Sequence, residues 1–189
     1  PSSVALFSLG LPIVELLFVR GNFNESDAIM TTMSLQAFSI GLFAFMLIKV
    51  LSASFFARQD TFTPLIITIL SFVMNVCLNY FLAFYLGYGH VGLALGSSIA
   101  AIVSVVIYYV ILSRNSFIEV TKQSLISIIK ILSANLVFYF IINFFAKNIS
   151  AINDQWLSNL VLLFGILFLI IFYFLILYLL GFKASFFRR

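Results

Sequence analysis

Long hydrophobic stretches alternate with short polar connections along the whole chain, and no stretch shows the period-two alternation of a barrel strand. A bilayer core about 30 Å thick needs about 20 apolar residues of helix, and several stretches reach that length. Because backbone polar groups inside a bilayer must be hydrogen-bonded within the protein, helices are required. The pattern predicts about six transmembrane segments: Val4–Val19, which is short and contains Pro12 and Glu15, then Ala28–Phe56, Pro64–Leu86, Val91–Leu112, Leu125–Ala146 and Leu157–Leu180.

Composition leads to the same fold class. Hydrophobic residues make up 63% of the 189 residues and charged residues only 8%, and the mean hydropathy is +1.21. A soluble domain carries roughly 25% charged residues, so this chain has too few charges to cover a water-facing surface. We therefore expect an all-α integral membrane protein. The net charge of +4 comes from scattered basic residues, which membrane topology explains better than a nucleic-acid partner.

The basic residues are divided unevenly between the two sides of the predicted bundle. Six lie in the second–third link, the fourth–fifth link and the carboxy-terminal tail: Arg58, Arg114, Lys122, Lys183, Arg188 and Arg189. The opposite side holds only Arg20 and Lys147, while Lys49 and Lys130 lie at or inside helix ends and are not counted. By the positive-inside rule, the richer side and the carboxy-terminus are cytoplasmic.

The sequence offers little for covalent chemistry. Cys77 is the only cysteine and His90 the only histidine, so a disulfide framework, a metal cluster and a Ser-His-Asp arrangement are all excluded. We expect no enzymatic activity, no catalytic or metal-binding residue and no cofactor, and leave coupling to a monovalent cation open. The chain opens with Pro1-Ser2-Ser3 and shows no signal peptide, so we expect it to be part of a longer protein.

Two places near the cytoplasmic side carry candidate functional charges. Lys49 lies deep in the second segment, where it could line a substrate path, because ionisable residues inside a membrane are costly. Its long stem could instead extend to the interface. In the following link, Asp60 or Thr61 could cap the third helix, and Arg58 or Asp60 could alternatively serve as a gate.

Asn75 and Asn79 are four residues apart and therefore share one face of the third helix, with Ser71 on the same stripe. Ser97 and Ser98 in the next helix could meet them. Polar side chains in lipid commonly join helices, with about 1 kcal/mol per contact. The alternative is a cation site, because amide, hydroxyl and backbone oxygens are hard ligands.

The stretch from Lys49 to Pro64 reads KVLSASFFARQDTFTP, and it resembles the signature of the MurJ (MviN) family of lipid II flippases. This family belongs to the multidrug/oligosaccharidyl-lipid/polysaccharide exporter superfamily. The resemblance covers essentially the whole chain through further pieces in the same order: PIVELLF from Pro12, RGNF from Arg20, GHVGLAL from Gly89, LGFK from Leu180 and FRR from Phe187.

The resemblance implies a fold of fourteen helices in two lobes and a final pair, of which this carboxy-terminal fragment holds the ninth to fourteenth. Residues 1–115 would belong to the carboxy-terminal transport lobe, and 116–189 to the final helix pair and a cytoplasmic tail. The implied function is alternating-access flipping of an undecaprenyl-pyrophosphate-linked precursor in the bacterial inner membrane, for cell wall biogenesis. The implied partners are that lipid, the bilayer and the missing amino-terminal lobe, whose cationic residues would hold the pyrophosphate.

The resemblance also bears on the Asn75 and Asn79 pair, since some relatives carry a sodium site here with an Asn-x-x-x-Asp pattern. This chain has Asn79 at the second position, so one formal charge is missing. Two rival functions remain at this point. One is another exporter of the same superfamily, moving drugs or O-antigen-type lipid-linked sugars. The other is a membrane scaffold without a substrate, in which Lys49, Asn75 and Asn79 would tolerate Leu.

The charge distribution generates a testable topology. Cysteines placed next to Arg58 and Lys122 should be shielded from membrane-impermeant thiol reagents in intact cells, whereas cysteines at Asn22 and Asp154 should react. Strong labelling at position 122 from outside would reverse the orientation. Labelling of the same variants in opened cells is the control for reactivity.

Overall fold

The computed structural model describes residues 1–18, 23–114, 122–149 and 155–180. These residues form the helices α1 (Ser2–Phe18), α2 (Glu25–Phe56), α3 (Phe62–Asn79), α4 (Gly89–Arg114), α5 (Lys122–Ile149) and α6 (Gln155–Leu179), and the π-helix η1 (Tyr80–Tyr85) continues α3. Each predicted segment corresponds to one helix, so the all-helical membrane fold is confirmed. Among the described residues, five helices are long and apolar enough to span a membrane, and α1, with 17 residues, is shorter.

The link residues used for the topology are only partly described. Arg20, Asn22, Asp154, Lys183, Arg188 and Arg189 lie outside the described residues. Arg58, Arg114 and Lys122 lie in or beside the described helices, all of them exposed. The sidedness of the chain therefore stays a prediction from charge.

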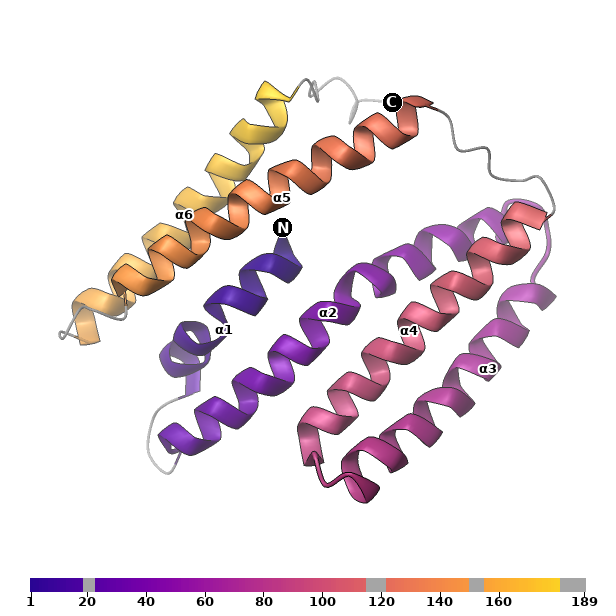
Figure 1. Cartoon of the computed structure of the whole chain (residues 1–189), viewed down its shortest axis with the longest axis horizontal. Coiled ribbons are helices and arrows are strands. Elements are labelled where there is room, and N and C mark those ends of the chain that lie inside the picture. The colour runs from indigo at the N-terminus through magenta and orange to yellow at the C-terminus, as the bar shows by residue number, and fades with distance from the viewer. Residues whose placement is uncertain (19–22, 115–121, 150–154, 181–189) are drawn as a thin grey trace. The chain divides into compact units, whose positions relative to one another are not determined.

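One compact unit, residues 20–119, contains α2, α3, η1 and α4. Within it α4 lies between α2 and α3, and those two outer helices hardly contact each other (Figure 1). Small residues bring α4 and α2 together: a Cβ at Gly41 would lie 2.5 Å from Ser98 Oγ. The Ser98 hydroxyl donates a 2.7 Å hydrogen bond to the Ala37 carbonyl. Close backbone approach of this kind stabilises helix pairs in lipid, where the hydrophobic effect does not act between helices.

The other unit, residues 1–19 and 120–189, contains α1, α5 and α6. Its core is one cluster of mostly large apolar side chains from all three helices, with α1 packed on α5 and α5 on α6: Leu9, Ala134, Phe138, Ile142, Leu169 and Tyr173. Contacts thus group α1 with α5 and α6, whereas the sequence-based division placed residues 1–115 together. That division concerns the lobes of a complete transporter, and it stays a prediction.

The link between α2 and α3 is a Schellman motif, in which the chain reverses after the last turn of α2. The Gln59 N–H donates to the Phe56 carbonyl at 3.0 Å, and the Asp60 N–H donates to the Phe55 carbonyl at 3.1 Å. Gln59 occupies the left-handed position of the motif, with φ of 61°. Glycine is the residue that normally fills this position, because a Cβ is strained there. The link between α2 and α3 therefore holds one residue, Gln59, in a strained backbone conformation.

Replacing the strained residue should stabilise the protein. We expect Gln59→Gly to raise the melting temperature of the purified full-length protein, with about 0.5–1 kcal/mol gained from relief of the left-handed strain. Gln59→Ala is the matched control, since it removes the polar side chain but keeps the Cβ. An equal rise in both variants would show that the side chain, and not the backbone, is responsible.

Candidate functional site

A row of polar side chains joins α3 to α4 along most of their shared length, and we call it the polar seam. From α3 it contains Thr68, Ser71, Asn75 and Asn79, and from α4 it contains Ser97, Ser104 and Tyr108. The α3 members recur every three or four residues, which places them on one helix face. Because α3 contacts its unit almost only through α4, this face holds the helix in place.

The polar seam has three levels, and each level is a hydrogen bond between α3 and α4. Near the Arg58–Asp60 link, the Tyr108 hydroxyl hydrogen-bonds the Thr68 side chain. One turn further, the Ser104 hydroxyl donates to Ser71 Oγ at 2.7 Å. Then Asn75 Nδ2 donates to Ser97 Oγ at 3.1 Å. Contacts of this type are each worth about 1 kcal/mol in a membrane, so three levels together hold an otherwise weakly packed helix.

The seam ends at a carbonyl oxygen that has no partner. Asn79 Nδ2 donates to Asn75 Oδ1 at 2.7 Å, but Asn79 Oδ1 is buried without a hydrogen bond among the described residues. This oxygen faces the backbone of Gly96, where an added Cβ would collide with it. Directly after Asn79 the backbone changes from α to π geometry in η1. π-turns inside α-helices occur frequently at functional sites.

A cation would find only part of a binding site here. Asn79 Oδ1 is available, but Asn75 Oδ1 already accepts from Asn79, and the Ser97 hydroxyl donates to the Leu93 carbonyl at 3.0 Å. The described residues contain no group of three or more His, Cys, Asp or Glu side chains. Because the amides and the hydroxyl already bond one another, the geometry favours helix joining. Ion binding would need a carboxylate from outside this chain.

The structure brings together most, but not all, of the polar residues that the sequence predicted to meet. Asn75, Asn79 and Ser97 form one cluster, and Ser71 extends the stripe as expected. Ser98 does not join them, because it points to the other side of α4 and bonds α2. Ser104 and Tyr108 were missed. Ser104 follows Ser97 by seven residues, a spacing that keeps two side chains on one helix face and could have revealed it.

Lys49 lies in α2 with its side chain exposed, between the exposed residues Met46 and Val50. Its carbonyl accepts a 3.1 Å hydrogen bond from the Ser52 hydroxyl, as is common for serine in transmembrane helices. The side chain is therefore not used to hold its own unit together. Both a substrate path and an interface position stay compatible with this placement.

The capping interaction expected in the α2–α3 link is present. Asp60 Oδ1 accepts a 3.0 Å hydrogen bond from the Thr63 N–H in the first turn of α3. Hydrogen bonds from the Thr63 side chain and then from its backbone lower the pKa of Asp60. Since the folded-state pKa lies below the unfolded value, the cap contributes stability at neutral pH and loses it as the pH falls through the folded pKa. A gating role for Arg58 or Asp60 stays a prediction.

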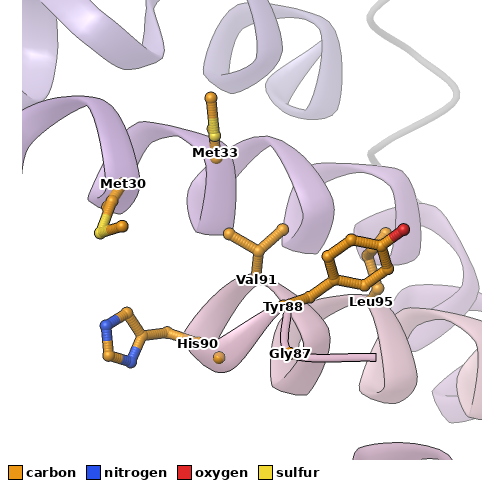
Figure 2. Close-up of a pocket in the computed structure, with 8 residues that line it drawn as sticks. Met30, Met33, Gly87, Tyr88, His90, Val91 and Leu95 are labelled. Atoms are coloured by element: carbon orange, nitrogen blue, oxygen red, sulfur yellow. The ribbon is translucent and has the colours of Figure 1, made fainter. Parts of the chain in front are cut away.

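A cavity of about 450 Å³ lies at the end of this unit opposite the Arg58–Asp60 link, between α2 and the start of α4 (Figure 2). Met30 and Met33 form its α2 side, and residues 87–91 with Leu95 form the other. His90 is among the lining residues, and Figure 2 shows its ring pointing away from that of Tyr88. The lining is mainly apolar and carries no carboxylate, so the cavity offers no general acid–base pair.

Comparison with known proteins gives a consistent result. A family model described as "Lipid II flippase MurJ" matches residues 1–167. A protein of Vibrio cholerae named "Probable lipid II flippase MurJ" is 38% identical over 124 residues, which cover 66% of this chain and 23% of the relative. A protein of the same name from Buchnera aphidicola subsp. Schizaphis graminum is 33% identical over 196 residues, covering 100% of this chain and 38% of the relative.

A solved structure shares the fold. The chain superposes on "Lipid II flippase MurJ, inward closed conformation" with a TM-score of 0.69 and 27% sequence identity, over 91% of this chain and 34% of the other. The matched segments thus cover between 23% and 38% of the length of these proteins.

The polar seam generates a test that separates helix joining from ion binding. If Asn75 and Asn79 join helices, Asn79→Leu should lower the melting temperature of purified full-length protein equally in sodium and in potassium. The expected loss is about 1–3 kcal/mol, because Asn75 Oδ1 loses its donor.

If the pair binds sodium instead, the wild-type protein should melt at a higher temperature in sodium than in potassium, because a ligand stabilises the state that binds it. Asn79→Asp should then enlarge that difference by restoring a charge. We expect no difference between the two salts. A sodium-specific stabilisation that disappears in Asn75→Ala would contradict the helix-joining interpretation.

Proposed function

Because the chain belongs to the MurJ family of lipid II flippases, we propose that it is the carboxy-terminal part of a protein that moves lipid II across the bacterial inner membrane. In this proposal the substrate is the undecaprenyl-pyrophosphate-linked precursor of peptidoglycan, and transport involves no covalent chemistry. The observation that carries the proposal is the family match over residues 1–167, supported by the common fold over 91% of the chain.

The unit of α2, α3 and α4 would form part of the wall of the transport path. A polar headgroup crossing a bilayer needs polar groups along its route, because an unpaired polar group in an apolar medium costs several kcal/mol. Lys49 would supply a positive charge to the anionic phosphates from the exposed side of α2. The remaining wall would come from the amino-terminal lobe. The polar seam would let α3 and α4 move together as one body when the path opens to alternate sides.

The α5–α6 pair would accommodate the prenyl chain of the substrate. Outward-facing side chains of α6 are large and apolar along its length: Leu163, Phe164, Leu167, Phe168, Ile171, Phe174 and Tyr178. A surface of this kind contacts hydrocarbon at no desolvation cost. In this proposal the two parts of the substrate take separate routes: a polar path carries the headgroup, and an apolar surface carries the lipid tail.

The orientation in the membrane is part of the proposal. The Arg58–Asp60 link, Lys122 and the carboxy-terminus would lie in the cytoplasm, following the excess of basic residues on that side. The apolar cavity beside Met30 and His90 would then lie at the external end of its unit.

The proposed role of Lys49 can be tested in the full-length protein. Lys49→Met keeps most of the stem and removes the charge, so it should impair rescue of a strain depleted of its own flippase while leaving the membrane level of the protein unchanged. Lys49→Arg retains a cation and should be milder, although the two cations are not interchangeable. Rescue by Lys49→Met as complete as by the wild type would show that the side chain only extends to the interface.

A further inference from the structure

Lys130 makes a contact that the proposed transport path does not use. From the third turn of α5, its ammonium donates a 2.8 Å hydrogen bond to the carbonyl oxygen of Leu180, directly after the last residue of α6. The residue is half-buried, and both partners belong to the same compact unit. Fifty positions of sequence separate them, so the contact exists only when α5 and α6 pack as they do here.

Within the residues that the structure describes, Lys130 is the cation that reaches the end of α6. The last carbonyl groups of a helix have no partner within it, and a lysine or arginine in the last turn commonly satisfies them. The last turn of α6 contains no basic residue. Its final residues, from Ile176 to Leu180, are hydrophobic or aromatic, so none carries a cation. Lys130 therefore supplies, from the neighbouring helix, the positive charge that favours a helix carboxy-terminus.

The position of Lys130 along α5 fits this function. From Lys130 to its end at Ile149, α5 spans about 30 Å at 1.5 Å per residue, which matches the hydrocarbon core of a bilayer. With Ile149 at one boundary of the hydrocarbon core, the ammonium would lie at the other boundary, where the helix leaves the hydrocarbon. At that boundary a charged group costs less free energy than at the bilayer centre. Little water is present to compete for the hydrogen bond, so the bond contributes more than it would at a fully solvated surface. The preceding two turns of α5, residues 122–129, extend beyond the end of α6.

We propose that Lys130 is a positioning residue that caps α6 from α5 and thereby fixes the register of the two helices at the membrane boundary. Apolar contacts alone define this register poorly, because lipid tails offer α6 equivalent contacts. A charge-assisted hydrogen bond is stronger than a neutral one and forms only when its donor and acceptor are close, so it favours the register in which Lys130 reaches the end of α6. The cap holds the surface to which the proposed function assigns the prenyl chain. Only that consequence rests on the proposed function, since the cap itself is a property of the fold.

Amide hydrogen exchange in full-length protein reconstituted in lipid nanodiscs tests the cap. In Lys130→Met the stem remains but the donor is lost, so amides in the last turn of α6 should exchange about tenfold faster than in the wild type. Lys130→Arg keeps a donor and should retain most of the protection. Lys122→Met is the matched control, because it removes an exposed lysine of the same helix eight residues earlier. It should leave exchange in α6 unchanged.

The possible results distinguish loss of the cap from general loosening of the α5–α6 pair and from failure of the proposed function. Unchanged exchange in Lys130→Met would overturn the proposal and leave Lys130 as a side chain that only reaches for water. Faster exchange in all three variants would also overturn it, since general loosening of the pair would then explain the effect. Lipid II movement by the wild-type protein is measured in the same nanodisc preparation after conversion to vesicles. Failure there would count against the proposed function, while the exchange result would still decide the cap.

Discussion

The requirement that each polar group inside a bilayer finds its partner within the protein governs this structure more than any other constraint. Water is absent there, so a hydroxyl or amide on a transmembrane helix must bond its own backbone or a neighbouring helix. Some side chains use their own backbone, as Thr32 does with the Ala28 carbonyl at 2.8 Å. Others bond across helices, and these bonds determine which helices pair. Ser98 joins α4 to α2, the polar seam joins α4 to α3, and Lys130 joins α5 to α6.

The two compact units meet this requirement with different kinds of side-chain contact. The α2–α4 unit has one cluster of large buried side chains around Phe55 and Tyr108, but small residues and hydrogen bonds join much of its helix length, so its backbones lie close and its interior is partly polar. The unit of α1, α5 and α6 packs through large side chains, including the Phe138 and Tyr173 rings with centroids 5.0 Å apart. A polar interior suits a wall along which a charged headgroup passes. An apolar unit suits contact with a lipid tail, and this contrast is the physical basis of the division of labour that we propose.

The hydrogen-bonding constraint also explains which site residues the sequence could reveal. Asn75 and Asn79 stand out in an apolar stretch, and their spacing alone places them on one face. Their partner on α4 could not be chosen from sequence, because Ser97 and Ser98 are adjacent and point about 100° apart on a helix. The structure directs Ser97 to Asn75 and Ser98 to the Ala37 carbonyl. Tyr108 was hidden for a different reason: an aromatic residue in a transmembrane helix is ordinary, and only its hydrogen bond to Thr68 reveals its place in the seam.

Hydrophobic run length, turn residues and charge counts determined the number, type and approximate ends of the helices, because these features are local and the bilayer fixes the length of a span. The sequence also identified the family through the stretch from Lys49 to Pro64. Only the tertiary structure decided how the helices pair, where α3 changes to π geometry, that Gln59 is strained, and that Lys130 caps α6. These features depend on contacts between residues far apart in the chain. The local sequence pattern does not reveal these contacts. A polar side chain in a membrane helix could bond any of several neighbours, and only the packing of the helices determines which one it bonds.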